Sequence, residues 1–165
     1  MGMQITAEAE RTIDAPASHV YQLIRDFRQH HPNFLPPHFS DFEIECGGVG
    51  SGTIHHFRMR LAGRTTKYRV RVGEPDPGRM LIESDASRRM LTTFTVDPAS
   101  GGRSRVRIHT RWYSNGLAGF MESLVAPTLL ARVYREELRL LDQYSRGELL
   151  RAVSTTRPLP WASAR

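Results

Sequence analysis

The fold is decided by residues 105–144, which read RVRIHTRWYSNGLAGFMESLVAPTLLARVYREELRLLDQY. In the first part, apolar or hydroxyl side chains alternate with basic ones, which is the two-residue period of a strand with one buried face. After Asn115-Gly116, apolar residues recur at i, i+3 and i+4, as in an amphipathic helix. The stretch therefore predicts a strand and then one long helix over 117–144, which Pro127 should bend. Its inward stripe is expected to hold Leu117, Phe120, Met121, Leu124, Thr128, Ala131, Leu138 and Leu141.

Runs with the same two-residue period continue upstream to about Phe39. Glycine and proline turns at 47–52, 75–78 and 101–102 separate these runs. With a first strand over residues 4–13, they predict about seven strands. The residues expected on the inward side are Ile5, Ala7, Ala9, Ile13, His55, Phe57, Met59, Tyr68, Val70, Val72, Glu83, Thr92, Phe94, Val106, Ile108, Thr110 and Trp112.

Two short helices are expected between the first strand and the rest of the sheet. Asp14-Ala15-Pro16 is typical of a helix start, because proline at the first helical position loses no internal hydrogen bond. Val20, Leu23, Ile24 and Phe27 follow at helical spacing. The segment 28–37, with His31, Phe34 and a Pro-Pro pair, predicts a second short helix or a turn-rich loop.

The composition indicates one globular domain. A chain of 165 residues with 39% hydrophobic side chains can bury a core, and it contains no apolar run near the roughly 20 residues that a bilayer requires. Cys46 is the single cysteine, and the start lacks the features of a secretory signal, so we expect a cytoplasmic protein. We expect residues 1–147 to form the domain and 148–165 to form a loosely ordered C-terminal tail.

This order of elements resembles the helix-grip fold of the START-like, Bet v1-like (SRPBCC) superfamily, which includes bacterial polyketide cyclase/dehydrase and lipid-transport proteins. The resemblance covers roughly residues 4–147 and is carried by the segments 13–21, 50–53, 74–79 and 116–141. It implies an α+β fold in which a curved antiparallel sheet of about seven strands wraps around the C-terminal helix. It also implies a cavity between sheet and helix for a lipid, polyketide or similar hydrophobic molecule.

If that cavity exists, periodicity indicates which side chains face it. Ligand sites combine apolar walls with a few polar groups that orient the ligand, although the same residues can also simply pack together as a core. The ligand-binding candidates are Phe27, Phe34, His55, Phe57, Met59, Tyr68, Val70, Phe94, Trp112, Phe120, Met121 and Leu124.

An enzymatic alternative follows from the same resemblance. A polyketide cyclase or dehydratase would need a group that moves protons, and His55, Tyr68 and Glu83 are the candidates. The sequence has no G-x-S-x-G nucleophile motif and no phosphate-binding loop. Adjacent His55 and His56 on a strand point to opposite faces, so they cannot chelate one ion; we therefore expect no metal and no cofactor.

A second alternative is binding to nucleic acid or a membrane surface, because the formal net charge is +6. Basic residues gather on the outer side of two consecutive strands: Arg58, Arg60, Lys67, Arg69 and Arg71. Glu8, Glu10, Glu43 and Glu45 share the outer side of strands that the family topology places beside basic strands, so cross-strand ion pairs should absorb much of this charge. We therefore expect no nucleic-acid partner, and regard a homodimer through an exposed strand edge as a further hypothesis.

Overall fold

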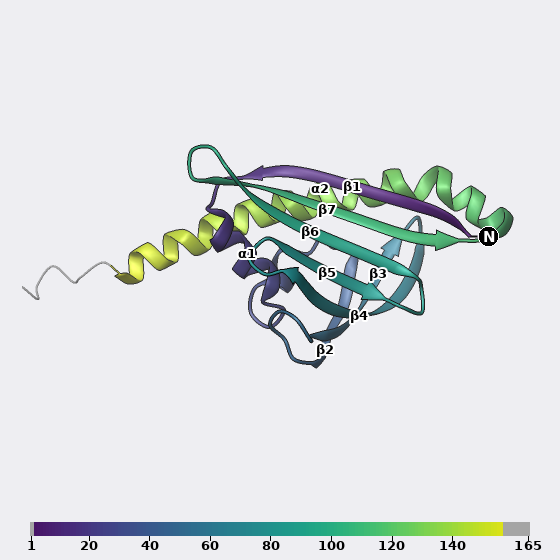
Figure 1. The fold of residues 1–165 in the computed structure, drawn as a ribbon, viewed down its shortest axis with the longest axis horizontal. Helices are drawn as coiled ribbons and strands as arrows, with labels where there is room; N and C mark the ends of the chain where they lie inside the picture. The colour runs from purple at the N-terminus through teal and green to yellow at the C-terminus, as the bar shows by residue number, and fades with distance from the viewer. Residues whose placement is uncertain (1, 157–165) are drawn as a thin grey trace, which may run out of the picture.

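The computed structural model describes residues 2–156, except for the side chains at 117, 119 and 120. Figure 1 shows the long helix α2 lying lengthwise along the sheet, with its last turns extending past the sheet. In chain order the elements are β1 Met3–Ile13, α1 Ala17–Arg25, the 3-10 helix η1 His31–Phe34, β2 Phe39–Cys46, β3 Ile54–Leu61, β4 Arg64–Asp76, β5 Met80–Asp85, β6 Met90–Ala99, β7 Arg103–Ser114 and α2 Gly116–Thr156.

The seven strands form one antiparallel sheet in the order β1-β7-β6-β5-β4-β3-β2. Successive strands pair through hairpins, while β1 joins β7 from the far end of the chain. Because the sheet curves around α2 and short helices follow β1, the predicted α+β helix-grip fold is confirmed.

Alternation along the strands places one face of the sheet in the core. Most inward residues of β3 to β7 are buried, those near the β3–β4 and β5–β6 turns and the end of β7, such as Tyr68, Met90 and Trp112, are half-buried, and the arginines and Lys67 on the outer face are exposed. Helix α1 adds Val20, Tyr21, Leu23 and Ile24 to the same core. It is fastened to β4 because Glu74 accepts hydrogen bonds from Arg25 (2.9 Å) and from the Tyr21 hydroxyl (2.8 Å).

Helix α2 is longer than the sequence predicted. It passes through Pro127 and Gly147 and ends at Thr156, within the segment 148–165 that was expected to be a tail. Glu148 and Arg151 form an ion pair of 2.8 Å one turn apart, which stabilises a helix modestly. A single glycine costs a helix only about 1 kcal/mol, so Gly147 need not end it. Residues 157–165, the rest of the expected tail, lie outside the described residues.

Candidate functional site

A cavity of about 690 Å³ lies between the concave face of the sheet and α2. This volume falls within the roughly 300–1,000 Å³ of small-molecule sites in proteins. The apolar part of its wall comes from both layers: Leu35, Phe39, Phe42, Phe57, Met59, Leu61, Tyr68, Met90, Phe94 and Trp112 on one side, and Ala118, Val125, Ala126, Leu129 and Leu130 on α2.

Stacked aromatic rings form the wall on the β2 to β4 side. Phe57 and Tyr68 are direct cross-strand partners, and their ring centroids are 5.1 Å apart. Phe39 packs against Phe57 at 5.4 Å, and His55 stacks on Phe42 at 4.8 Å. Each ring is held by its neighbours, so this wall presents a preformed apolar surface.

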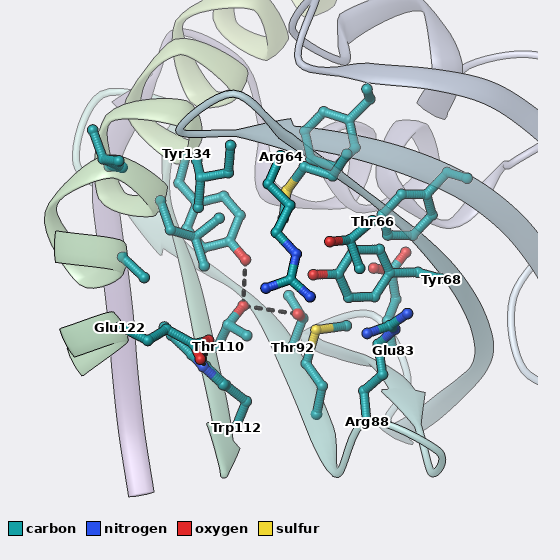
Figure 2. A pocket seen from close by; sticks show the side chains of 18 of the residues that line it. Arg64, Thr66, Tyr68, Glu83, Arg88, Thr92, Thr110, Trp112, Glu122 and Tyr134 are labelled. Atoms are coloured by element: carbon teal, nitrogen blue, oxygen red, sulfur yellow. Dashed lines mark hydrogen bonds between the residues drawn. The ribbon is translucent and has the colours of Figure 1, made fainter. Parts of the chain in front are cut away.

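A row of polar side chains crosses the floor of the cavity. Glu83, Thr92 and Thr110 are successive cross-strand partners on β5, β6 and β7, so the register alone brings them together. The Thr92 and Thr110 hydroxyl oxygens are 2.8 Å apart, and Thr110 is also hydrogen-bonded to the Tyr134 hydroxyl on α2 (Figure 2). Burial raises the pKa of Tyr134, so this phenol stays protonated.

His55 and Glu83 form a buried pair at the same level. The His55 Nε2 atom lies 3.2 Å from a Glu83 carboxylate oxygen. Burial by itself would raise the pKa of Glu83, but the hydrogen bond to His55 and the charges of His55 and His31 outweigh it and lower the pKa. The His55 Nδ1 atom is buried and makes no hydrogen bond to any residue that the structure describes. Such an orphaned polar atom is costly unless a ligand or water satisfies it.

Glu137, which sequence reasoning missed, is a second buried carboxyl in the wall. It is 2% exposed, lines the cavity and has no hydrogen-bond partner within residues 2–156. Burial, and then the negative charge of Glu83, raise its pKa well above the ordinary value. The neutral carboxyl therefore offers an O–H donor to whatever occupies the cavity. An acidic residue three positions after Tyr134 and four before Leu141, inside the apolar stripe, was the signal available in the sequence.

The exposed part of the cavity wall lies at the hairpin tips and the start of α2. Three arginines are found there, Arg64 on the β3–β4 hairpin and Arg88 and Arg89 on the β5–β6 turn. Glu122 of α2 lies there as well, and it accepts hydrogen bonds from the Trp112 indole and the Ser114 hydroxyl, both at 2.9 Å. We call this set of residues the mouth.

The predicted site residues divide into two groups. The structure brings one group together in the cavity wall: His55, Phe57, Met59, Tyr68, Glu83, Phe94 and Trp112. Phe27, Phe34 and Val70 are instead fully buried in the core and do not line the cavity. The inward direction predicted for Val70 is confirmed, but its side chain is enclosed by the core. Phe27 and Phe34 are packed against other aromatic rings: Phe27 stacks on His31, and Phe34 contacts His31 and Tyr144.

The predicted inward direction of Met121 and Leu124 is wrong. They are 56% and 59% exposed, and the α2 residues in the wall are instead Ala118, Glu122, Val125 and Ala126. On the cavity side of the helix, Glu122 accepts hydrogen bonds from Trp112 and Ser114 of β7, which is consistent with this face of α2 being the one turned toward the sheet. The side chain of Phe120 lies outside the described residues.

The surface charges are partly paired, as expected. Glu45 binds Arg69 at 2.6 Å, and Glu10 lies 3.6 Å from Arg105. Across residues 2–156, no group of three or more histidine, cysteine, aspartate or glutamate side chains could hold a metal ion, and no helix is long and apolar enough to cross a membrane. The expected absence of a cofactor and of a nucleic-acid partner stays a prediction.

The fold and the site define a class: a helix-grip protein with an internal cavity that has apolar walls and a polar floor. Within this class, the chain belongs to the family "Polyketide cyclase / dehydrase and lipid transport", whose model matches residues 4–146. The family, and with it the SRPBCC superfamily, agrees with the resemblance seen in the sequence.

Solved structures show the same fold. The KanY protein (ms6282) is 29% identical, with a TM-score of 0.77 over 87% of this chain and 99% of that one. The Zhui aromatase/cyclase from Streptomyces sp. R1128 is 14% identical, with a TM-score of 0.70 over 89% and 96%. A major latex-like protein from Panax ginseng is 13% identical, with a TM-score of 0.65 over 87% and 99%. No protein of curated function matches the chain significantly.

Proposed function

We propose that this protein binds a hydrophobic small molecule, a lipid, a polyketide or a similar compound, in the cavity between the sheet and α2. The observation that carries the proposal is the combination of apolar walls with an inward polar group that lacks a partner among the described residues, the Glu137 carboxyl. A fully apolar ligand would leave this carboxyl unsatisfied, so the ligand should carry an oxygen function at its inner end.

The walls supply the binding free energy, and the floor supplies the orientation. Each Å² of apolar surface removed from water contributes roughly 25 cal/mol before the costs of association are subtracted. The Phe57 and Tyr68 rings on one side and the small residues of α2 on the other leave a space for a flat or chain-like body. Glu137 donates to an oxygen of the ligand at the floor.

Filling the cavity tests this proposal. In Ala126→Phe a large ring projects from α2 into the cavity, whereas Thr128→Phe places the same ring on an exposed position two residues away. The probe is Nile red, a neutral hydrophobic dye, measured by fluorescence titration. We expect Ala126→Phe to weaken dye binding about tenfold or more, since losing burial of a few methylene-sized groups costs over 1.4 kcal/mol. Thr128→Phe should bind as the wild type does; equal dye binding by all three proteins would contradict the cavity assignment.

Acid–base catalysis is a second candidate, favoured by the two carboxyls of the cavity. The pKa of Glu83 is lowered and that of Glu137 is raised, which is the pattern of one ionised base beside one protonated acid. A cyclase or dehydratase acting on a polyketide would use the His55–Glu83 pair to accept a proton from carbon. Burial raises the pKa of Tyr68, so this phenol acts only as a donor.

Turnover separates this candidate from passive binding. If the cavity is catalytic, His55→Gln should lower the conversion of a poly-β-keto substrate by about 10²-fold or more. Nile red affinity should change little. A wild-type protein that binds the substrate but leaves it unconverted would favour passive binding.

We also propose that the protein is cytoplasmic, which the single, exposed Cys46 supports because such a thiol suits a reducing compartment. The homodimer hypothesis concerns β2, which is an edge of the sheet. Sedimentation equilibrium of the purified protein measures the oligomeric state directly.

A further inference from the structure

Arg64 stands at the mouth on a tight hairpin. Ala62 and Gly63 connect β3 to β4, both with positive φ (50° and 75°), and Leu61 pairs with Arg64 across the turn. Arg64 has the same parity on β4 as Thr66 and Tyr68, which line the cavity. Its side chain is therefore on the concave face, and Figure 2 shows the guanidinium projecting into the pocket.

This guanidinium has no protein partner among residues 2–156, in either a hydrogen bond or an ion pair. Each carboxyl that lines the same cavity either is hydrogen-bonded to another side chain or is protonated. Glu83 is bound to His55, Glu122 accepts from Trp112 and Ser114, and the raised pKa of Glu137 keeps it protonated. Arginine is always charged and has five donors in a planar fork, which fits a carboxylate or a phosphate.

Arg88 adds a second positive charge on the opposite hairpin. Its Nε donates to the Lys67 carbonyl at 2.9 Å, and its Cζ lies 5.0 Å from the centre of the Tyr68 ring. The charge therefore rests against the aromatic wall of the cavity. Arg89 follows and lies 4.7 Å from the Tyr113 ring. With three arginines against one acidic residue, Glu122, the mouth attracts anions, whereas the negative charge of Glu83 repels them from the floor.

We propose that the natural ligand is an amphiphile whose oxyanion, a carboxylate or a phosphate, binds Arg64 at the mouth while its uncharged body occupies the cavity. The inference rests on the proposed function, since it assigns the orientation and charge class of the same ligand. The anion faces outward, and the oxygen function at the inner end is neutral.

Displacement of Nile red by matched twelve-carbon probes tests this inference. The probes are dodecanoate, dodecyl phosphate and the neutral methyl dodecanoate, all below their aggregation limits. In the wild type, we expect at least one of the two anions to bind about tenfold more tightly than the ester, since a hydrogen bond to a charged group contributes about 1.5–3 kcal/mol. Preference for dodecanoate would indicate a carboxylate ligand, and preference for dodecyl phosphate a phosphate.

The deciding variant is Arg64→Gln, and Arg60→Gln is its matched control. Arg60 is exposed on the same hairpin but has the opposite parity, so the control loses the same charge from the outer face. Arg64→Gln should remove the preference for anions and leave ester affinity within about twofold, while Arg60→Gln keeps the preference. Equal binding of acid, phosphate and ester, or equal effects of the two variants, would overturn the inference and leave the proposed function intact. Failure of both Nile red and the ester to bind the wild type would overturn both.

Discussion

The two halves of α2 meet the sheet in different ways. From Leu130 to Ser145 the helix buries a continuous stripe against the sheet, and Leu138 at its centre is 0% exposed. From Gly116 to Leu129 it stands away from the sheet across the cavity, and Met121 and Leu124 are exposed. One helix therefore serves as an exposed cavity wall in its first half and mainly as a core element in its second, where Leu130, Tyr134 and Glu137 also line the cavity.

Polar contacts follow the same division. In the second half, the buried Asp142 accepts hydrogen bonds from the Asp14 backbone amide (3.0 Å) and from the Arg11 and Arg146 side chains (3.2 and 2.6 Å), which joins α2 to the end of β1. In the first half, Glu122 makes the contacts with β7 from an exposed position. Exposed contacts stabilise weakly, so the difference predicts a firmly held half and a loosely held half.

The largest effect is expected in the buried half. Leu138→Ala should lower the free energy of unfolding by about 2–5 kcal/mol, because it removes a fully enclosed side chain and leaves a cavity. Urea denaturation measures the change. Leu150→Ala is the control, since Leu150 belongs to the same helix and is 69% exposed. If both variants lost equal stability, the division between the halves would not hold.

An intermediate effect is expected at Glu137, which lies in the buried half and also lines the cavity. Its raised pKa means that the unfolded chain releases a proton that the folded chain keeps. The contribution of Glu137 to the free energy of unfolding is therefore at its full value below the ordinary glutamate pKa of about 4.3. It declines as the pH rises, by at most about 1.4 kcal/mol per pH unit.

Glu137→Gln should remove this decline, so the variant gains stability relative to the wild type between about pH 5 and 7. Denaturation midpoints of both proteins across this range give the difference. His31, whose pKa is lowered by burial, also makes stability depend on pH, but it contributes to both proteins and cancels from the comparison. Parallel stability curves would show that Glu137 ionises normally in the folded protein.

The smallest effect is expected in the first half of the helix. Leu124→Ser should change the free energy of unfolding by less than about 0.5 kcal/mol, because surface substitutions rarely do more. Thermal unfolding monitored by circular dichroism is sufficient. A loss above 1 kcal/mol would mean that this face is packed in solution. The two halves of α2 would then differ less in packing than the structure indicates.

The same division explains how much could be predicted from the sequence. A strand side chain has only two directions, so parity placed His55, Phe57, Tyr68 and Trp112 correctly without knowledge of their neighbours. A helix offers a full circle of directions. Large apolar residues on two adjoining faces, such as Met121 and Val125, do not reveal which face turns inward.

Glu137 and the end of α2 were missed for related reasons. The burial of an acidic residue depends on the tertiary partners around it, here the floor of the cavity, and helical period alone shows only that Glu137 shares the stripe of Leu141. The residue at which a helix ends depends on small free-energy contributions that partly cancel. Here Gly147 destabilises the helix, and the Glu148–Arg151 ion pair stabilises it.

The chain of hydroxyls from Thr92 through Thr110 to Tyr134 has a chemical consequence of its own. Each hydroxyl can both give and receive a hydrogen bond, so the three protons can all point one way along the chain or all point the other way. With one polarity the end of the chain presents a proton, and with the other it presents a lone pair. A ketone and the corresponding alcohol would then be held at the same place, without any heavy atom of the protein having to move.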